Sequence, residues 1–248
     1  MRTWLVAAVA AIAIQPMVSL AATGEKVTYE VNNQSFEGYY VSPGNDAPLV
    51  LIIHDWDGLT DYEVKRANML AMMGYAVFAA DLFGAGVRPT EVADKRQHTG
   101  ELYKDRAKMR ALMLGAIEVA ATKGADVGNT VVMGYCFGGA AVLELARSGA
   151  DLKGFATFHG GLKTPEGQSY ADTKGQVLVM HGTADSNITM DQFATLASQL
   201  EAASVKHEMV TYSGAPHAFT VFGSERYRED ADKKSWRRFS EFLEENLR

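Results

Sequence analysis

The segment 134–139, Gly-Tyr-Cys-Phe-Gly-Gly, restricts the fold of this chain more than any other and contains its one cysteine, Cys136. The run Thr130–Met133 before it predicts a short buried strand, and the run Ala140–Ala146 after it predicts a helix. A strand, a glycine-flanked turn and a helix are the setting of a nucleophile elbow, where bulky neighbours would clash. The pattern therefore predicts a nucleophilic cysteine. The alternative is a buried cysteine in an ordinary strand–turn–helix.

The start of a helix alters the chemistry of a thiol placed there. Backbone N–H groups and the helix dipole favour negative charge, so we expect the thiol of Cys136 to ionise readily. Because the sequence has a single cysteine, it offers neither an internal disulfide nor a resolving cysteine for redox chemistry.

The first residues predict an export signal. A positively charged start is followed by an apolar run over residues 4–14, which is short for a membrane span. Ser19 and Ala21 then provide the small residues of a cleavage site. We expect residues 1–21 to be a signal peptide and residues 22–248 to form a single domain. The mature protein is expected to be periplasmic or secreted and free of the membrane, the alternative being an uncleaved anchor.

Charge and motif content restrict the partners. The net charge is −6 and both signs are spread along the chain, which argues against nucleic acid and anionic membranes. No pair or cluster with metal-ligand spacing and no glycine-rich phosphate loop occurs in the sequence. We therefore expect no metal and no cofactor, and a small molecule as the substrate. The oligomeric state is left open.

Strand and helix patterns alternate along most of the chain. An antiparallel pair is predicted at 26–31 and 36–41, before this alternation begins. The order of elements predicts an α/β fold with a mostly parallel central sheet and helices on both faces. The further predicted strands are 48–54, 75–80, 130–133, 153–158, 176–180 and 206–212, and the predicted helices are 61–73, 101–122, 140–146, 189–203 and 229–247.

A cysteine nucleophile needs a base, and the base needs an acid that orients it. In α/β-hydrolases the chain order is nucleophile, acid, histidine. Asp185 follows the predicted strand 176–180, and His217 follows the last predicted strand. Both lie where ligands bind in open α/β sheets, at the carboxyl ends of strands. We therefore predict Cys136, Asp185 and His217 as a catalytic triad.

Other residues fit these two roles less well. Asp172 precedes a strand and Asp191 lies within a predicted helix, while His207 begins a strand and so lies at the wrong edge of the sheet. The alternative interpretation of Asp185 is a turn-forming residue, and that of His217 is a solvated loop histidine.

Several segments taken together resemble one known family. They are residues 53–61 (Ile-His-Asp-Trp-Asp-Gly-Leu-Thr-Asp), 74–83, 134–139, 181–185 and 216–219 (Pro-His-Ala-Phe). The chain resembles the dienelactone hydrolase family of α/β-hydrolases over nearly its whole mature length. The resemblance implies that Cys136, Asp185 and His217 are the catalytic residues. It further implies an oxyanion hole made by the backbone N–H groups of Phe137 and Trp56.

The chain departs from the family at the substrate side. Asp55 stands where the family often has a glutamate that interacts with the resting thiol, and the alternative interpretation of Asp55 is a residue that caps the loop before the next helix. Ala85 and Val221 stand where members that take dienelactones use arginines to hold the substrate carboxylate, although Arg88 lies near the first position. We therefore expect neutral esters or lactones to be substrates at least as good as dienelactones. Candidate substrate-binding residues are Phe83, Arg88, Tyr135, His159 and Phe219, of which the aromatic ones could equally be core residues.

These observations favour an exported hydrolase of small esters or lactones that works through an acyl-cysteine intermediate. An acyltransferase that passes the same acyl group to another acceptor is an alternative, which product analysis would distinguish. The second alternative is a non-catalytic module that binds a small molecule. Such a module would retain Cys136, Asp185 and His217 but would not turn over a substrate.

Overall fold

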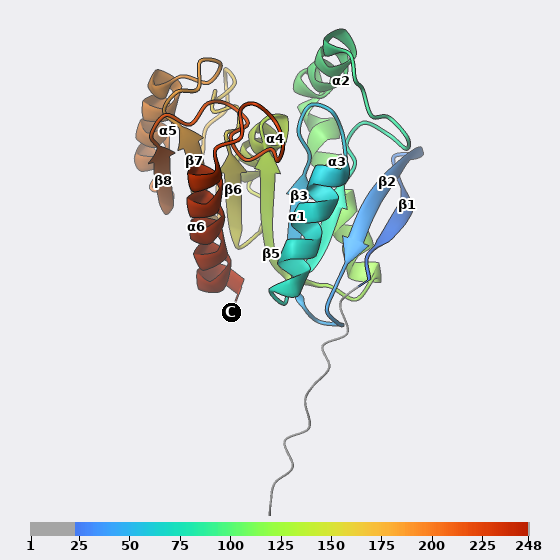
Figure 1. Ribbon diagram of the computed structural model, residues 1–248. Helices are drawn as coiled ribbons and strands as arrows, with labels where there is room; N and C mark the ends of the chain where they lie inside the picture. Colours follow the sequence, from blue (N-terminus) through green and yellow to red (C-terminus); the bar gives the residue numbers. More distant parts are fainter. Residues whose placement is uncertain (1–22, 248) are drawn as a thin grey trace, which may run out of the picture.

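Residues 23–247 are described by the computed structural model, in which one mixed sheet forms the centre of the molecule (Figure 1). The sheet has the strand order β1-β2-β4-β3-β5-β6-β7-β8, and only the pairs β1–β2 and β2–β4 are antiparallel. This arrangement confirms the predicted α/β-hydrolase fold. The predicted signal peptide lies outside the described residues and stays a prediction.

The strands and helices agree with most of the predicted segments to within a few residues. The strands are β1 Glu25–Val31, β2 Gln34–Val41, β3 Pro48–Ile53, β4 Ala76–Ala80, β5 Asp126–Tyr135, β6 Gly154–Phe158, β7 Gln176–Gly182 and β8 His207–Tyr212. The helices are α1 Asp61–Met72, α2 Val92–Lys104, α3 Arg106–Thr122, α4 Phe137–Arg147, α5 Met190–Ala202 and α6 Glu229–Leu247.

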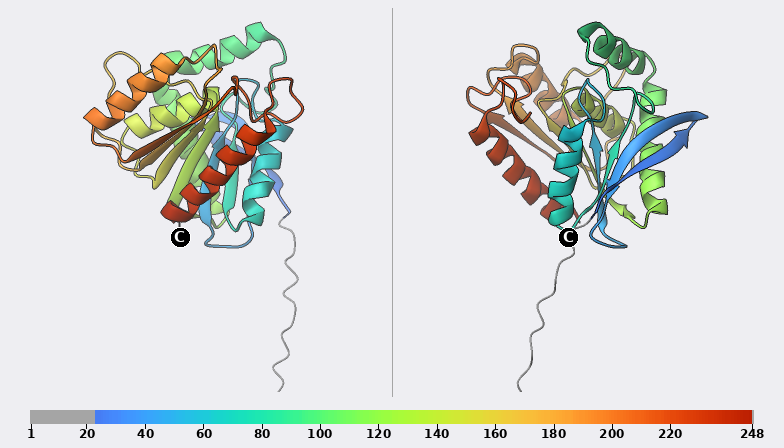
Figure 2. Two further views of the ribbon diagram at one scale, coloured as in Figure 1. Left: turned by 60° about the vertical axis from the view of Figure 1, so that its left-hand side comes forward. Right: turned by 45° about the vertical axis from the view of Figure 1, so that its right-hand side comes forward.

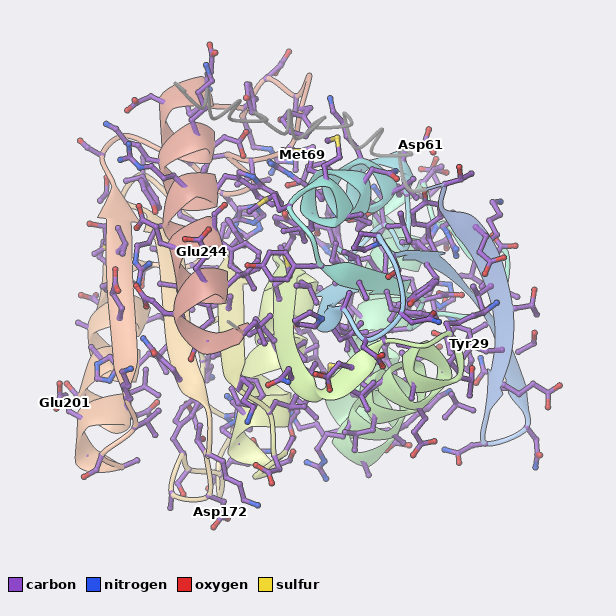
Figure 3. The ribbon with its side chains drawn as sticks, turned by 90° about the horizontal axis from the view of Figure 1, so that it is seen from below. Tyr29, Asp61, Met69, Asp172, Glu201 and Glu244 are labelled. Atoms are coloured by element: carbon purple, nitrogen blue, oxygen red, sulfur yellow. The ribbon has the colours of Figure 1, made fainter. Side chains whose placement is uncertain are left out.

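Helices cover both faces of the sheet and bury two separate cores. Strand β3 directs Leu51 and Ile53 toward α3 and α4, and it directs Val50 and Ile52 toward α1 and α6. Successive strand residues point to opposite faces, so a strand buried on both faces is apolar throughout. Helices α1 and α6 lie together on one side of the sheet (Figure 2), and the view from below shows them there with Met69 and Glu244 labelled (Figure 3).

One predicted helix is wrong in extent. The segment predicted as a single helix over 101–122 belongs to two helices, because α2 begins at Val92 and ends before Asp105. The Asp105 side chain accepts a hydrogen bond from the Lys108 N–H at 2.9 Å and so caps α3. Only Thr99 and Leu102 of α2 are buried, so this helix lacks the apolar stripe by which a helix is recognised in a sequence. No helix among residues 23–247 is long and apolar enough to cross a membrane.

The turn between β5 and α4 has the geometry of an elbow. Cys136 adopts φ +50°, a backbone conformation that residues with a side chain rarely take. A Cβ on Gly138 would lie 2.3 Å from the Ile53 carbonyl oxygen, and one on Gly134 would lie 2.3 Å from the Gly138 backbone. Both positions therefore require glycine, as expected from the sequence.

Candidate active site

The fold brings the three predicted triad residues together at the carboxyl ends of β5, β7 and β8. His217 Nε2 lies 3.0 Å from Cys136 Sγ, and His217 Nδ1 lies 2.7 Å from Asp185 Oδ2. Cys136 occupies the elbow, Asp185 lies in the loop after β7, and His217 lies in the loop after β8. A continuous hydrogen-bonded chain thus runs from thiol to imidazole to carboxylate.

The carboxylate of Asp185 is fixed by its surroundings. Its Oδ1 accepts hydrogen bonds from the backbone N–H groups of Asn187 and Ile188, each at 2.9 Å. Burial raises the pKa of Asp185, but the hydrogen bonds from His217 and the two backbone N–H groups outweigh it, so the pKa lies below its ordinary value. An ionised Asp185 accepts a hydrogen bond from His217 Nδ1–H, an arrangement in which Nε2 is unprotonated and can take a proton from the thiol.

The thiol differs from the sequence-based expectation. Burial, and after it the nearby Asp55 carboxylate, raises the pKa of the Cys136 thiol well above its ordinary value, although the Phe137 N–H acts in the opposite direction. The helix N-terminus therefore does not produce a resting thiolate, because burial and a neighbouring negative charge are the larger effects. The site at rest contains a neutral thiol beside an imidazole.

Asp55 contacts both the thiol and one of the predicted oxyanion donors. Its Oδ1 accepts the Trp56 N–H at 2.5 Å, and its side chain is hydrogen-bonded to Cys136. Burial, followed by the nearby Asp57 carboxylate, raises the pKa of Asp55 to about 6, while the Trp56 N–H and the thiol lower it. Of the two predicted oxyanion donors, the Phe137 N–H faces the sulfur and the Trp56 N–H is held by this carboxylate.

A pocket of about 330 Å³ opens above the thiol. Three of its residues, Arg96, Thr99 and Tyr103, come from α2 and follow the i, i+3, i+7 spacing of one helix face. None of the three was predicted as a pocket residue, because the sequence pattern indicates no helix before residue 101 and the i, i+3, i+7 spacing carries no information without one. The pocket is lined by Asp55, Trp56, Arg96, Thr99, Tyr103, Cys136, Phe137, Gly161, Asn187, Ile188, His217, Ala218 and Arg226.

Two exposed arginines, Arg96 and Arg226, stand at this pocket although the positions 85 and 221 carry none. The loss of arginine at those two positions therefore does not leave the pocket without positive charge. Across residues 23–247, no group of three or more His, Cys, Asp or Glu side chains has an arrangement that could hold a metal ion.

Arg88, predicted as a substrate-binding candidate, does not line the pocket. Its guanidinium donates hydrogen bonds to the backbone oxygens of Leu59, Val87 and Glu37, and it lies 3.6 Å from Asp81. Its side chain thus braces the loops beside β4 and is not available to a ligand in the pocket.

The four aromatic candidates are also buried beneath the pocket and do not line it. Phe83 packs against the rings of His54 and Phe137, while Tyr135 and Phe219 lie in the core formed with α1 and α6. His159 is fully buried, with its ring 5.3 Å from that of His217 and its Nε2 2.8 Å from Thr220 Oγ1. Burial lowers the pKa of His159 well below its ordinary value, so it lies behind His217 as a neutral ring.

The parallel sheet, the elbow and the residues gathered at its edge define an α/β-hydrolase. The model of the dienelactone hydrolase family matches residues 36–247, so the chain belongs to this family, as the sequence motifs predicted. A protein from Salmonella typhimurium named "Putative carboxymethylenebutenolidase" is 25% identical over 218 residues, which is 83% of this chain and 81% of that protein.

Solved structures agree with this assignment. A crystal structure described as a dienelactone hydrolase-like promiscuous phosphotriesterase from metagenomic libraries is 28% identical, with a TM-score of 0.85. A structure named m3DLH is 30% identical, also with a TM-score of 0.85. Each match covers 92% of this chain and 100% of the other.

Proposed function

We propose that this protein hydrolyses small esters or lactones through a covalent acyl-cysteine at Cys136. Membership of the dienelactone hydrolase family supports ester or lactone hydrolysis in general. The observation that carries the finer proposal is the chain from Cys136 Sγ through His217 to Asp185 at the floor of an open pocket.

The geometry supports a two-step acyl transfer. His217 Nε2 takes the thiol proton as Cys136 Sγ bonds to the substrate carbonyl carbon, and the oxyanion forms near the N–H groups of Phe137 and Trp56. The C–O bond of the ester breaks, and the departing alkoxide takes the proton from His217. A water molecule then gives a proton to His217 as its oxygen attacks the thioester carbon. The C–S bond breaks, the acid leaves, and Cys136 Sγ takes the proton back from His217, which restores the thiol.

Asp55 is proposed to keep the thiol unreactive before substrate binds. Its carboxylate contacts the thiol and also the Trp56 N–H, a donor needed by the oxyanion. A substrate carbonyl therefore has to replace the carboxylate at that N–H before the attack, so that reactivity depends on occupancy of the pocket.

Single substitutions in the triad test the mechanism. Cys136→Ala and His217→Ala should each reduce kcat/KM for a neutral p-nitrophenyl ester by at least about a thousandfold, because triad residues act as a unit. Asp185→Asn should reduce it by roughly 10²–10⁴-fold through loss of the correct imidazole tautomer.

The matched controls are Asp191→Asn and His207→Ala, the poorer candidates for the same roles, and both should retain activity. Retained hydrolysis in Cys136→Ala would refute the acyl-cysteine. Product analysis with competing amine or alcohol acceptors separates a hydrolase from an acyltransferase. Ligand binding without turnover would instead indicate a binding module.

Alkylation kinetics test the resting state. Asp55→Asn removes the negative charge beside the thiol, so the pKa of Cys136 should fall and iodoacetamide should react faster, by about tenfold for each pKa unit. Asp57→Asn is the matched control, because Asp57 is more exposed and does not contact the thiol. Equal alkylation rates in the wild type and Asp55→Asn would contradict only this role of Asp55, since the triad is tested separately.

A further inference from the structure

A second cavity, of about 490 Å³, adjoins the catalytic pocket. The two share Tyr103, Gly161 and Ile188, and the Gly161 N–H donates to the Cys136 carbonyl oxygen at 3.2 Å. The second cavity also borders α4 at Ala140 and again at Arg147, two turns further on. With a rise of about 1.5 Å per residue, it follows the helix away from the thiol for roughly 10 Å.

The wall of this cavity carries excess positive charge. The Glu144 carboxylate has 0% exposure and is paired with Arg106 at 3.0 Å, Arg110 at 2.6 Å and Arg147 at 3.0 Å. One negative charge thus faces three positive charges, which leaves two without a carboxylate in this cluster. Two of the three arginines, Arg106 and Arg147, line the cavity.

Arg106 has unused hydrogen-bonding capacity at this wall. It donates to Glu144 through Nη1 alone, and its ring neighbour is Tyr103, at 5.5 Å from the guanidinium carbon. A guanidinium has five N–H donors, so most of those of Arg106 remain for a ligand. Arg147, in contrast, also bonds Gln168 and Tyr170. Lys163 adds a further exposed positive charge to the lining, and Glu166 is the single acidic residue there.

We propose that this second cavity binds the anionic end of an extended substrate whose ester carbonyl lies at Cys136. The proposal rests on the proposed hydrolase function and names the substrate class: an ester with a carboxylate or phosphate at the far end of its acyl or alcohol part. Tyr103 and Gly161 form the passage between the two cavities, and Arg106 is the specificity-determining residue. A guanidinium suits this role, since it binds such anions through two parallel N–H groups.

The first experiment compares p-nitrophenyl monoesters of dicarboxylic acids, from glutarate to sebacate, with the same esters ending in a neutral amide. For the acid of suitable length, the wild type should prefer the carboxylate form by about tenfold or more in kcat/KM, the effect of one charge-assisted hydrogen bond. Arg106→Gln should reduce that ratio to about one. Acetyl esters of ω-hydroxy acids carry the carboxylate at the end of the alcohol part of the ester. Their hydrolysis, measured as acetate release, tests in the same way whether the anion binds from that part.

Arg110→Gln is the matched control, because Arg110 pairs with the same Glu144 but lines neither cavity. The preference should persist in this variant. If Arg106→Gln and Arg110→Gln lose the carboxylate preference equally, the cause is the summed positive charge of the cluster, and the site at Arg106 is refuted. The site is also refuted if the wild type shows no preference in either substrate series.

A binding measurement separates this proposal from the hydrolase function. Calorimetry of suberate with Cys136→Ala should show binding that Arg106→Gln weakens and Arg110→Gln does not. Cys136-dependent hydrolysis without anion preference would refute the second site alone. If the protein shows no hydrolysis that depends on Cys136, the proposed function is refuted, whatever the calorimetry shows.

Discussion

Asp55 is a carboxylate buried beside a thiol, and this placement opposes folding. Burial raises its pKa from an ordinary 3.8 to about 6, with a further contribution from Asp57. Between these two pH values the folded state holds a proton that the unfolded chain has lost. Stability therefore falls as the pH rises through this range, and the loss is complete above about pH 6.

Asp55→Asn should therefore stabilise the protein at neutral pH. The expected gain is up to about 3 kcal/mol, since each pKa unit corresponds to about 1.4 kcal/mol, and it should nearly vanish below the ordinary pKa of aspartate. Denaturant unfolding at a series of pH values measures it, with the exposed Asp191→Asn as the control. A gain of the same size at every pH would show that charge burial is not its cause.

The meeting of Cys136, Asp185 and His217 could be predicted because each follows a strand and their chain order is restrictive. The positions of Arg96 and Arg226 at the pocket could not be predicted, since neither residue belongs to a recognisable motif. Both are brought to the pocket only by the tertiary fold. His159 and Phe219 were predicted to bind substrate but do not line the pocket. They follow strands β6 and β8 but point into the protein interior. Position at a strand end predicts nearness to the site, but it does not predict which way a side chain faces.

At the scale of elements, the contact of α4 with β3 depends on the absence of a side chain. A Cβ on Gly138 would lie 2.3 Å from the Ile53 carbonyl oxygen and 2.6 Å from that of His54, and backbone atoms cannot move aside. Gly138→Ala should therefore destabilise the fold by about 1–3 kcal/mol or more and displace the elbow.

Gly100→Ala is the matched comparison, because a Cβ there would meet nothing within 4 Å. Within helix α2 the same substitution should stabilise by about 0.5–1 kcal/mol through helix propensity. Urea unfolding of both variants should give changes of opposite sign. Equal stability of Gly138→Ala and the wild type would mean that the backbone contact is not restrictive.

The elements were predictable to different degrees. Strands β3 and β5 are apolar over several consecutive residues because helices cover them on both sides. Helix α2 was missed over most of its length, since a helix that lies over a pocket buries few of its side chains. Segments of this kind fold according to their neighbours, which a local pattern does not contain.

At the scale of the whole molecule, parallel topology explains why residues far apart in the chain meet. The strands β5, β7 and β8 run the same way, so the segments that follow them gather at one edge of the sheet. That convergence could be predicted from the order of elements, while the cavities could not. A groove of about 940 Å³ between β8 and α6 is larger than the pocket above Cys136 and is lined by none of Cys136, Asp185 and His217, so cavity size does not locate the predicted site.

Helix α2 lines the catalytic pocket but supplies no residue of the proposed triad or oxyanion hole. In the proposed reaction this helix face would contact the substrate, while the residues proposed to make and break bonds belong to other segments. Tyr103 packs on Phe137 of the elbow, so substitutions at Arg96 and Thr99 are the ones expected to change the outline of the pocket without altering the elbow. Selection or a small combinatorial library acting on these two positions would redirect this scaffold toward new compounds.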